Sequence, residues 1–160
     1  MPAQHEIAGS NETGVPVDLE ALERVASIVL SREVDEPAEM SFVIVDDARI
    51  RELNREWRGY DESTDVLSFG LSERSKPAVD DEIPFPFPRA DEDILHLGEV
   101  IISHPTAERQ ALEYARPLEE ELRHLLIHGI LHLLGYDHAE PDETAAMQER
   151  EHALLRETAP

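Results

Sequence analysis

The sequence contains no cysteine and only one lysine, Lys76. Without cysteine no disulfide framework can form, and any metal ion must be held by His, Asp or Glu side chains. No run of about 18 apolar residues exists, which excludes a membrane-spanning helix. The first residues lack the basic and apolar regions of a signal peptide, so we expect a cytoplasmic protein.

Basic residues are scarce as well, because 14 Lys and Arg stand against 36 Asp and Glu, a formal net charge of −22. Such a field repels polyanions within a Debye length of roughly 8 Å at physiological salt. Taken alone, the charge argues against a nucleic-acid partner. The alternative, which we favour, is that acidity serves solubility while a local cluster of arginines overrides it at one site.

What the sequence does contain is sufficient for one globular domain of 160 residues, 41% hydrophobic and 31% charged. Short apolar runs predict strands near 5–8, 40–45, 66–69 and 97–102. Amphipathic spacing predicts helices near 19–29, 47–57, 105–115, 117–134 and 142–156. This order predicts an α+β fold, with a mixed central sheet of about four strands packed with helices.

Three stretches are expected to lie outside these elements, within a single domain that spans 1–160. Four prolines and clustered acids predict a surface insertion loop at 72–94. Residues 1–4 and 157–160 are expected to be flexible termini.

The helix predicted from Pro117 carries three histidines, His124, His128 and His132, each four residues from the next. Two imidazoles at this spacing lie on one face of a helix and can reach one zinc ion at about 2.0–2.1 Å. All three cannot, because His124 and His132 are separated by roughly 12 Å of helix rise. A metal ion must therefore use one adjacent pair.

The residues that follow favour the second pair. Gly135 is the residue type that accepts a left-handed helix cap, so the chain can reverse there and bring His138 back toward His132. The spacing of His128, His132, Gly135 and His138 matches that of metzincin zinc sites. Three histidines leave a fourth position open for water, which is the catalytic arrangement. His124 is then a supporting or a structural residue.

One position departs from the metzincin pattern. The general base of those peptidases is a Glu directly after the first histidine, and here that position is Gly129. Without the carboxylate, a peptidase would lack the group that takes the proton from water. The zinc prediction survives this departure, and the peptidase hypothesis is weakened.

The stretch His128–His138 resembles the signature of the YbeY-type endoribonucleases, which are bacterial rRNA maturation factors. Two further blocks agree with that family in order and spacing: Leu53-Asn54 followed by Arg58-Gly59 and Thr64–Phe69, and then Leu97–Ser103. The resemblance covers nearly the whole chain. The histidine block is highly specific, and the strand blocks are less so.

The resemblance implies a single-strand-specific endoribonuclease that acts in 16S rRNA 3′-end maturation and ribosome quality control. It implies one Zn²⁺ per chain, held by His128, His132 and His138, at the end of a long buried helix beside the central sheet. The implied partners are single-stranded RNA of the 16S rRNA precursor, the small ribosomal subunit, and assembly factors such as an Era-like GTPase. Neither a membrane nor DNA is implied.

The family's functionally important arginine falls on Arg58, so Arg58 and His128 are the candidate catalytic residues. Cleavage of a phosphodiester builds negative charge on phosphoryl oxygens, which a guanidinium stabilises through paired hydrogen bonds. Arg51 and Arg55 share the helix with Arg58 and are either RNA-backbone contacts or a solvated face. Asp65 or Asp137 could orient a ligand imidazole.

Two other hypotheses stay open on the sequence. The chain could be a divergent metallopeptidase, because an acidic surface suits basic peptides. It could also be a non-catalytic ribosome-assembly factor whose zinc is structural. Arg58 and the open coordination position favour the endoribonuclease.

Overall fold

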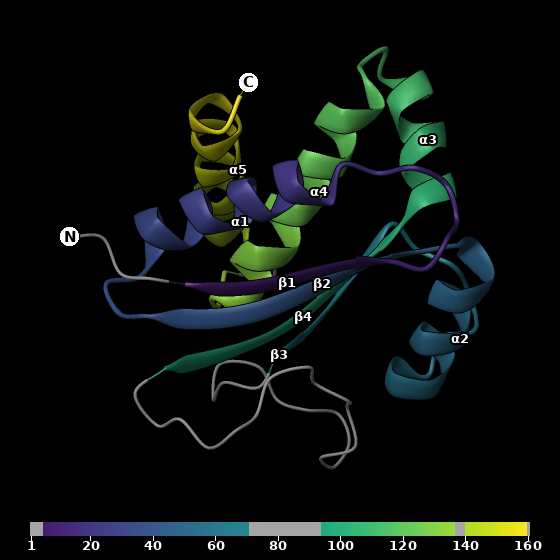
Figure 1. Cartoon of the computed structure of the whole chain (residues 1–160), viewed down its shortest axis with the longest axis horizontal. Coiled ribbons are helices and arrows are strands. Elements are labelled where there is room, and N and C mark those ends of the chain that lie inside the picture. The colour runs from purple at the N-terminus through teal and green to yellow at the C-terminus, as the bar shows by residue number, and fades with distance from the viewer. Residues whose placement is uncertain (1–4, 71–93, 137–139, 160) are drawn as a thin grey trace.

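The computed structural model describes residues 5–70, 94–136 and 140–159 (Figure 1). The elements in chain order are β1 Glu6–Asn11, α1 Leu19–Glu33, β2 Ala38–Val45, α2 Asp47–Arg58, β3 Val66–Gly70, β4 Leu95–Ser103, α3 His104–Glu113, α4 Leu118–Leu133 and α5 Pro141–Glu157. This order confirms the single α+β domain predicted from the sequence. None of the described helices is long and apolar enough to cross a membrane.

The sheet is mixed, as predicted, with the strand order β1-β2-β4-β3. The central strands β2 and β4 run parallel, with Val43 opposite Ile101, and β1 lies parallel to β2 on the other side. The short strand β3 pairs antiparallel with β4 and forms one edge. All eight residues of β2 are buried, which explains the run of aromatic and β-branched residues Phe42–Val45 in its second half.

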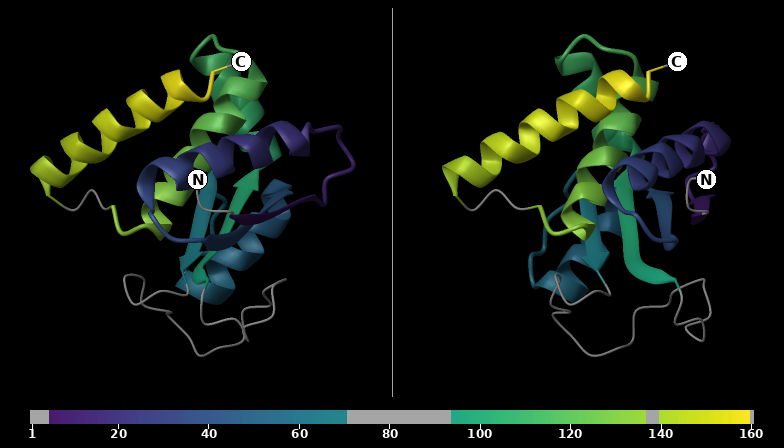
Figure 2. Two further views of the ribbon diagram at one scale, coloured as in Figure 1. Left: turned by 60° about the vertical axis from the view of Figure 1, so that its left-hand side comes forward. Right: turned by 90° about the vertical axis from the view of Figure 1, so that its left-hand side faces the viewer.

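Helices cover both faces of the sheet, because side chains alternate along each strand. Met40, Phe42 and Ile44 of β2 belong to the larger apolar cluster with α1 and α4. Val43 and Val45 face the opposite way, into a smaller cluster beneath α2. The two faces are visible in Figure 1, and Figure 2 shows α5 lying across α4 on the side away from the sheet.

The helix that was predicted to carry the metal site is the most enclosed one. Nine of the 16 residues of α4 are buried, and the helix packs against β3, β4, α1, α3 and α5. Truncating a buried Leu in such a setting costs about 2–5 kcal/mol, so the helix is a rigid support for its polar side chains.

The ends of some strands and helices differ from those predicted. β1 continues to Asn11 and β4 begins at Leu95, because both strands pair along β2. The C-terminal tail expected at 157–160 begins within an element. Glu157 ends α5, and the buried Thr158 hydroxyl donates to the Leu154 carbonyl at 2.7 Å. The insertion expected at 72–94 lies outside the described residues except for Ile94.

Candidate metal centre and catalytic site

Two of the three predicted zinc ligands lie together at the C-terminal end of α4. The Nε2 atoms of His128 and His132 are 3.1 Å apart, and their ring centroids are 4.6 Å apart. Two imidazole nitrogens at zinc-ligand distance in a tetrahedral site stand about 3.4 Å from each other. The pair therefore fits a shared metal ion with a small outward rotation of the rings.

The helix ends with the left-handed turn that the sequence predicted. Gly135 has a φ of 101°, and its N–H donates to the His132 carbonyl at 3.0 Å. The Tyr136 N–H donates to the Leu131 carbonyl at 3.0 Å, which completes a Schellman motif. The chain thus changes direction directly after His132. His138 and Asp137 lie outside the described residues, so the third ligand stays a prediction.

A buried carboxylate on α1 fixes the positions of the segments on either side of that turn. The Tyr136 hydroxyl donates to Glu33 Oε1 at 2.9 Å, and Arg150 Nε of α5 donates to Glu33 Oε2 at 2.6 Å. Burial raises the pKa of Tyr136, and the hydrogen bond to Glu33 raises it further. The end of α4 is therefore tied to both α1 and α5.

The histidines of α4 share a carboxylate that the sequence analysis missed. Glu151 Oε1 of α5 lies 2.5 Å from His128 Nδ1 and 3.8 Å from His124 Nε2. Burial alone would raise the pKa of Glu151, but the two imidazoles outweigh it and lower the pKa to about 2. A sequence signal did exist, because Glu151 falls at helical spacing between the buried Met147 and Leu154.

Asp65, one of the two carboxylates considered for this orienting role, has other partners. It accepts hydrogen bonds from the Val66 N–H at 2.8 Å and from Gln110 Nε2 at 3.2 Å. The carboxylate that contacts His128 is instead Glu151.

The departure from the metzincin pattern has a packing explanation. A Cβ at Gly129 would lie 2.6 and 3.0 Å from the two methyl groups of Val100 on β4, and 3.3 Å from Ser68 Oγ on β3. Position 129 therefore faces the sheet at close approach, and a Glu could not be accommodated there without moving α4. The structure leaves no room for the peptidase carboxylate at this position.

Arg58 lies beside β3, the edge strand of the described sheet, next to the same region of α4. It is the last residue of α2, which Gly59 ends with a φ of 80°. Its Nη2 donates to the Ser68 carbonyl at 3.2 Å, and its guanidinium carbon lies 6.0 Å from the centre of the Phe69 ring. Ser68 Oγ in turn donates to the Gly129 carbonyl at 3.0 Å. A single residue of β3 thus separates Arg58 from the helix that carries the histidines.

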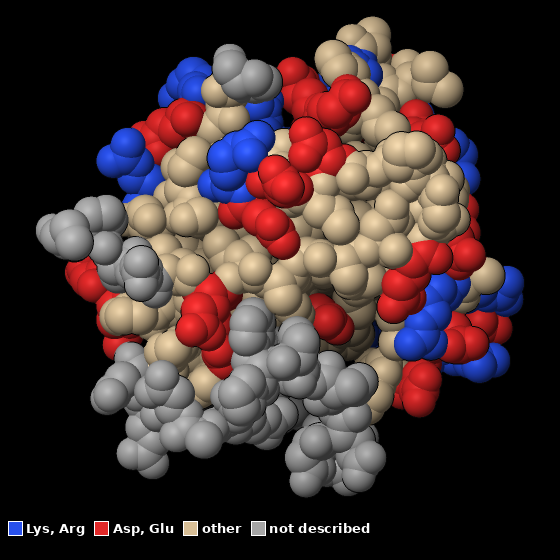
Figure 3. Space-filling view, in the orientation of Figure 1, with Lys and Arg blue, Asp and Glu red and all other residues tan. Residues whose placement is uncertain are grey.

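The four arginines of α2, which are Arg49, Arg51, Arg55 and Arg58, differ in how far their charges are compensated. Arg49 pairs with Glu52 on the same helix. Arg51 binds Asp61 through two hydrogen bonds of 2.9 and 3.2 Å. The hydrogen bond from Arg51 lowers the pKa of Asp61, and Arg55 adds to this effect. No carboxylate pairs with Arg58 among the residues that the structure describes. Basic groups at the edge formed by α2 alternate with acidic ones in Figure 3.

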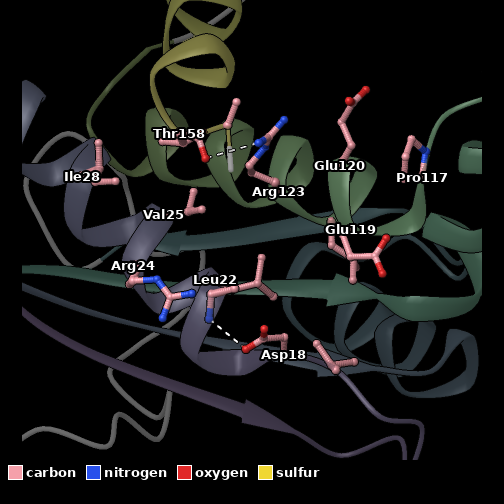
Figure 4. A pocket seen from close by; sticks show the side chains of 14 residues that line it. Asp18, Leu22, Arg24, Val25, Ile28, Pro117, Glu119, Glu120, Arg123 and Thr158 are labelled. Atoms are coloured by element: carbon pink, nitrogen blue, oxygen red, sulfur yellow. Dashed lines mark hydrogen bonds between the residues drawn. The ribbon is translucent and has the colours of Figure 1, made fainter.

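A separate hollow of about 680 Å³ lies along the N-terminal half of α4, between α1 and the end of α5. Its wall is largely apolar, and Figure 4 shows Arg123 on it, whose Nη1 donates to the Thr158 carbonyl at 3.3 Å. The residues that line it include none of the histidines. The hollow is therefore distinct from the candidate metal centre.

The family model and the curated relatives agree on one family. A family model described as endoribonuclease YbeY matches residues 8–159. The endoribonuclease YbeY of Moorella thermoacetica is 47% identical over 138 residues, which cover 86% of this chain and 84% of that protein. That of Heliobacterium modesticaldum is 46% identical over 123 residues, which cover 76% and 70%. The solution structure of TM1509 from Thermotoga maritima matches with a TM-score of 0.64 and 29% identity, over 95% and 88% of the two chains.

The fold and the paired imidazoles define a class of single-domain α+β proteins with a candidate metal centre at the end of a buried helix. The similarities then narrow this class, because they span nearly the whole chain. The chain belongs to the endoribonuclease YbeY family. The resemblance found in the sequence is thereby confirmed.

Proposed function

We propose that this protein is a zinc-dependent endoribonuclease specific for single-stranded RNA. The observation that carries the proposal is the pair of Nε2 atoms, 3.1 Å apart on His128 and His132, in a chain whose relatives are named endoribonucleases. The neighbouring Arg58 supplies the positive charge that cleavage of a phosphodiester requires.

The side chains present suit zinc. Both imidazoles offer a ring nitrogen on one helix face, and a carboxylate contacts the far nitrogen of His128, as is usual for zinc-bound histidine. His128, His132 and His138 would hold one ion and leave a position open. A bound zinc would act as a Lewis acid and lower the pKa of its water to about 7.

Arg58 would bind the phosphate. Its one described hydrogen bond is to a backbone carbonyl, so its charge is free to meet an anion, and two of its N–H groups can bind one phosphate in parallel. We assign Arg58 the role of stabilising charge on the phosphoryl oxygens.

We further propose the biological role that the family resemblance implies. The substrate would be the 3′ end of precursor 16S rRNA in the cytoplasm, in maturation and in ribosome quality control. The partners would be the small ribosomal subunit and assembly factors such as an Era-like GTPase. The motif blocks around Arg58 and the histidines support this proposal.

A cleavage assay tests the proposed activity. Zinc-loaded protein is incubated with a labelled single-stranded RNA, with the same RNA as a duplex, and with casein. We expect cleavage of the single strand, little cleavage of the duplex and none of casein. A chelator should abolish the cleavage of RNA, and added zinc should restore it. Cleavage that resists the chelator would contradict zinc dependence. No RNA cleavage, with intact binding to ribosomal subunits, would favour a non-catalytic assembly factor.

A further inference from the structure

Glu151 is a carboxylate in an otherwise apolar stripe. The three buried residues of α5 are Met147, Glu151 and Leu154, and the Glu151 side chain is only 8% exposed. Burying a carboxylate is costly unless charged or hydrogen-bonding partners compensate for the lost water. A Gln or a Leu at this position would avoid that cost. The contacts of Glu151 must therefore explain why a carboxylate is buried here.

Its contacts are imidazoles of α4. Oε1 lies 2.5 Å from His128 Nδ1, a hydrogen-bond distance, and 3.8 Å from His124 Nε2, which is too long for one. His124 has a second polar neighbour in Arg116, whose Nη1 lies 3.5 Å from its Nδ1. The short contact of Glu151 is therefore with His128 alone.

This contact decides which ring nitrogen of a neutral His128 carries the proton. A carboxylate only accepts hydrogen bonds, so the proton lies on Nδ1 and the lone pair on Nε2. Nε2 is the atom that faces His132. The ring is thus held in the orientation and the tautomer that a metal ligand needs.

We propose that Glu151 is a positioning residue that presents His128 Nε2 as a metal ligand. The proposal rests on the proposed zinc site, and it adds a residue from a different helix to it. Docking of α5 on α4 then prepares the site for its ion. Outer carboxylates of this kind typically change metal affinity by about 10–100-fold.

The alternative is that Glu151 only joins two helices. A structural role would lower the melting temperature of the zinc-free protein and affect zinc binding only through loss of fold. A positioning role would weaken zinc binding in a protein that remains folded. It would also change the tautomer of His128 before any ion is added.

The test uses Glu151→Ala, Glu151→Gln and the matched control Glu39→Gln in the full chain. Glu39 is also buried and also contacts an imidazole, that of His96, which belongs to the sheet. The zinc dissociation constant is measured by competition with a chelating dye. The tautomer of His128 is read from ¹⁵N chemical shifts of the ring in zinc-free protein, and melting temperatures report the fold.

We expect Glu151→Ala to weaken zinc binding by about 10–100-fold and to mix the two tautomers. Glu151→Gln keeps an acceptor oxygen but loses the charge, so it should bind zinc at an intermediate strength. Glu39→Gln should bind zinc like the unmodified protein. If Glu151→Ala fails to fold, Glu151→Gln decides the question.

Two outcomes overturn the inference. Wild-type zinc affinity and an unchanged His128 tautomer in the folded Glu151 variants would show that the residue is structural, while the proposed zinc site would stand. An unmodified protein that binds no zinc would instead contradict the proposed function, and the positioning role would fall with it.

Discussion

The described part of the molecule contains two buried carboxylates that contact an imidazole from another element. In the sheet, Glu39 of β2 contacts His96 Nδ1 of β4. Between the helices, Glu151 of α5 contacts His128 Nδ1 of α4. The two carboxylates are similarly enclosed, with side-chain exposures of 3% and 8%. Local burial therefore does not distinguish them.

The charged groups around Glu39 and Glu151 do distinguish the two carboxylates. Burial raises the pKa of Glu39, His96 lowers it and the nearby Glu6 raises it, and the net shift is upward. Two imidazoles lower the pKa of Glu151 instead. The Nε2 of His128 also faces a second imidazole at 3.1 Å. A carboxylate–imidazole contact becomes a candidate metal site only where a second donor stands at ligand distance.

The strongest test of this difference removes one imidazole from each place. His132→Ala should lower zinc affinity by more than about 100-fold, because a direct ligand contributes more than an outer carboxylate. His96→Ala should leave zinc binding unchanged. Elemental analysis and dye competition measure both variants. Full zinc occupancy in His132→Ala, or loss of zinc from His96→Ala, would contradict the assignment of the metal site to the helices.

Arg58→Ala should have the next largest effect, on turnover rather than on zinc. Loss of one preorganised charge-stabilising donor costs about 10²–10³ in turnover. Arg58→Lys should recover part of it, since an ammonium keeps the charge and loses the paired geometry. Single-turnover cleavage, zinc content and melting temperature are measured on the same preparations.

The matched control is Arg49→Ala, an exposed arginine of α2 that pairs with Glu52. It should cleave at close to the unmodified rate. Wild-type cleavage by Arg58→Ala would refute the phosphate-binding role. Early melting of that variant would show that the bond to the Ser68 carbonyl is structural.

The raised pKa of Glu39 predicts how the folding stability of the protein changes with pH. A carboxyl whose folded pKa lies above its unfolded value favours folding in its protonated form. Its contribution is therefore fully present below about pH 4.5 and is lost as the pH rises through the raised pKa. Glu39→Gln should remove this loss, so the variant should gain stability relative to the unmodified protein between pH 4 and 7. Urea unfolding at both pH values measures the gain, and an equal difference at both would contradict it.

The sequence predicted the elements and the helix that carries the histidines, because hydrophobic periodicity and the Asp18, Asp46 and Gly135 signals are local. It did not predict that β4 lies between β2 and β3, since strand order depends on long-range pairing. Glu151 was missed for the same reason, as 23 residues separate it from His128. The role of Gly129 likewise required the distance to Val100.

The smallest effect should come from His124, the third histidine of α4. A metal ion on this helix must use either His124 with His128 or His128 with His132, because the outer two are too far apart. His128 turns Nδ1 toward Glu151 and Nε2 toward His132, which selects the second pair. His124 lies 3.8 Å from Glu151 and 3.5 Å from Arg116, so it adds to the field around the carboxylate. His124→Ala should therefore retain most of its zinc, with a change in affinity below about 10-fold. The zinc affinities of His124→Ala and His132→Ala, measured side by side by dye competition, show which pair of histidines binds the ion. Loss of zinc from the first variant and not from the second would place the metal one turn earlier on the helix.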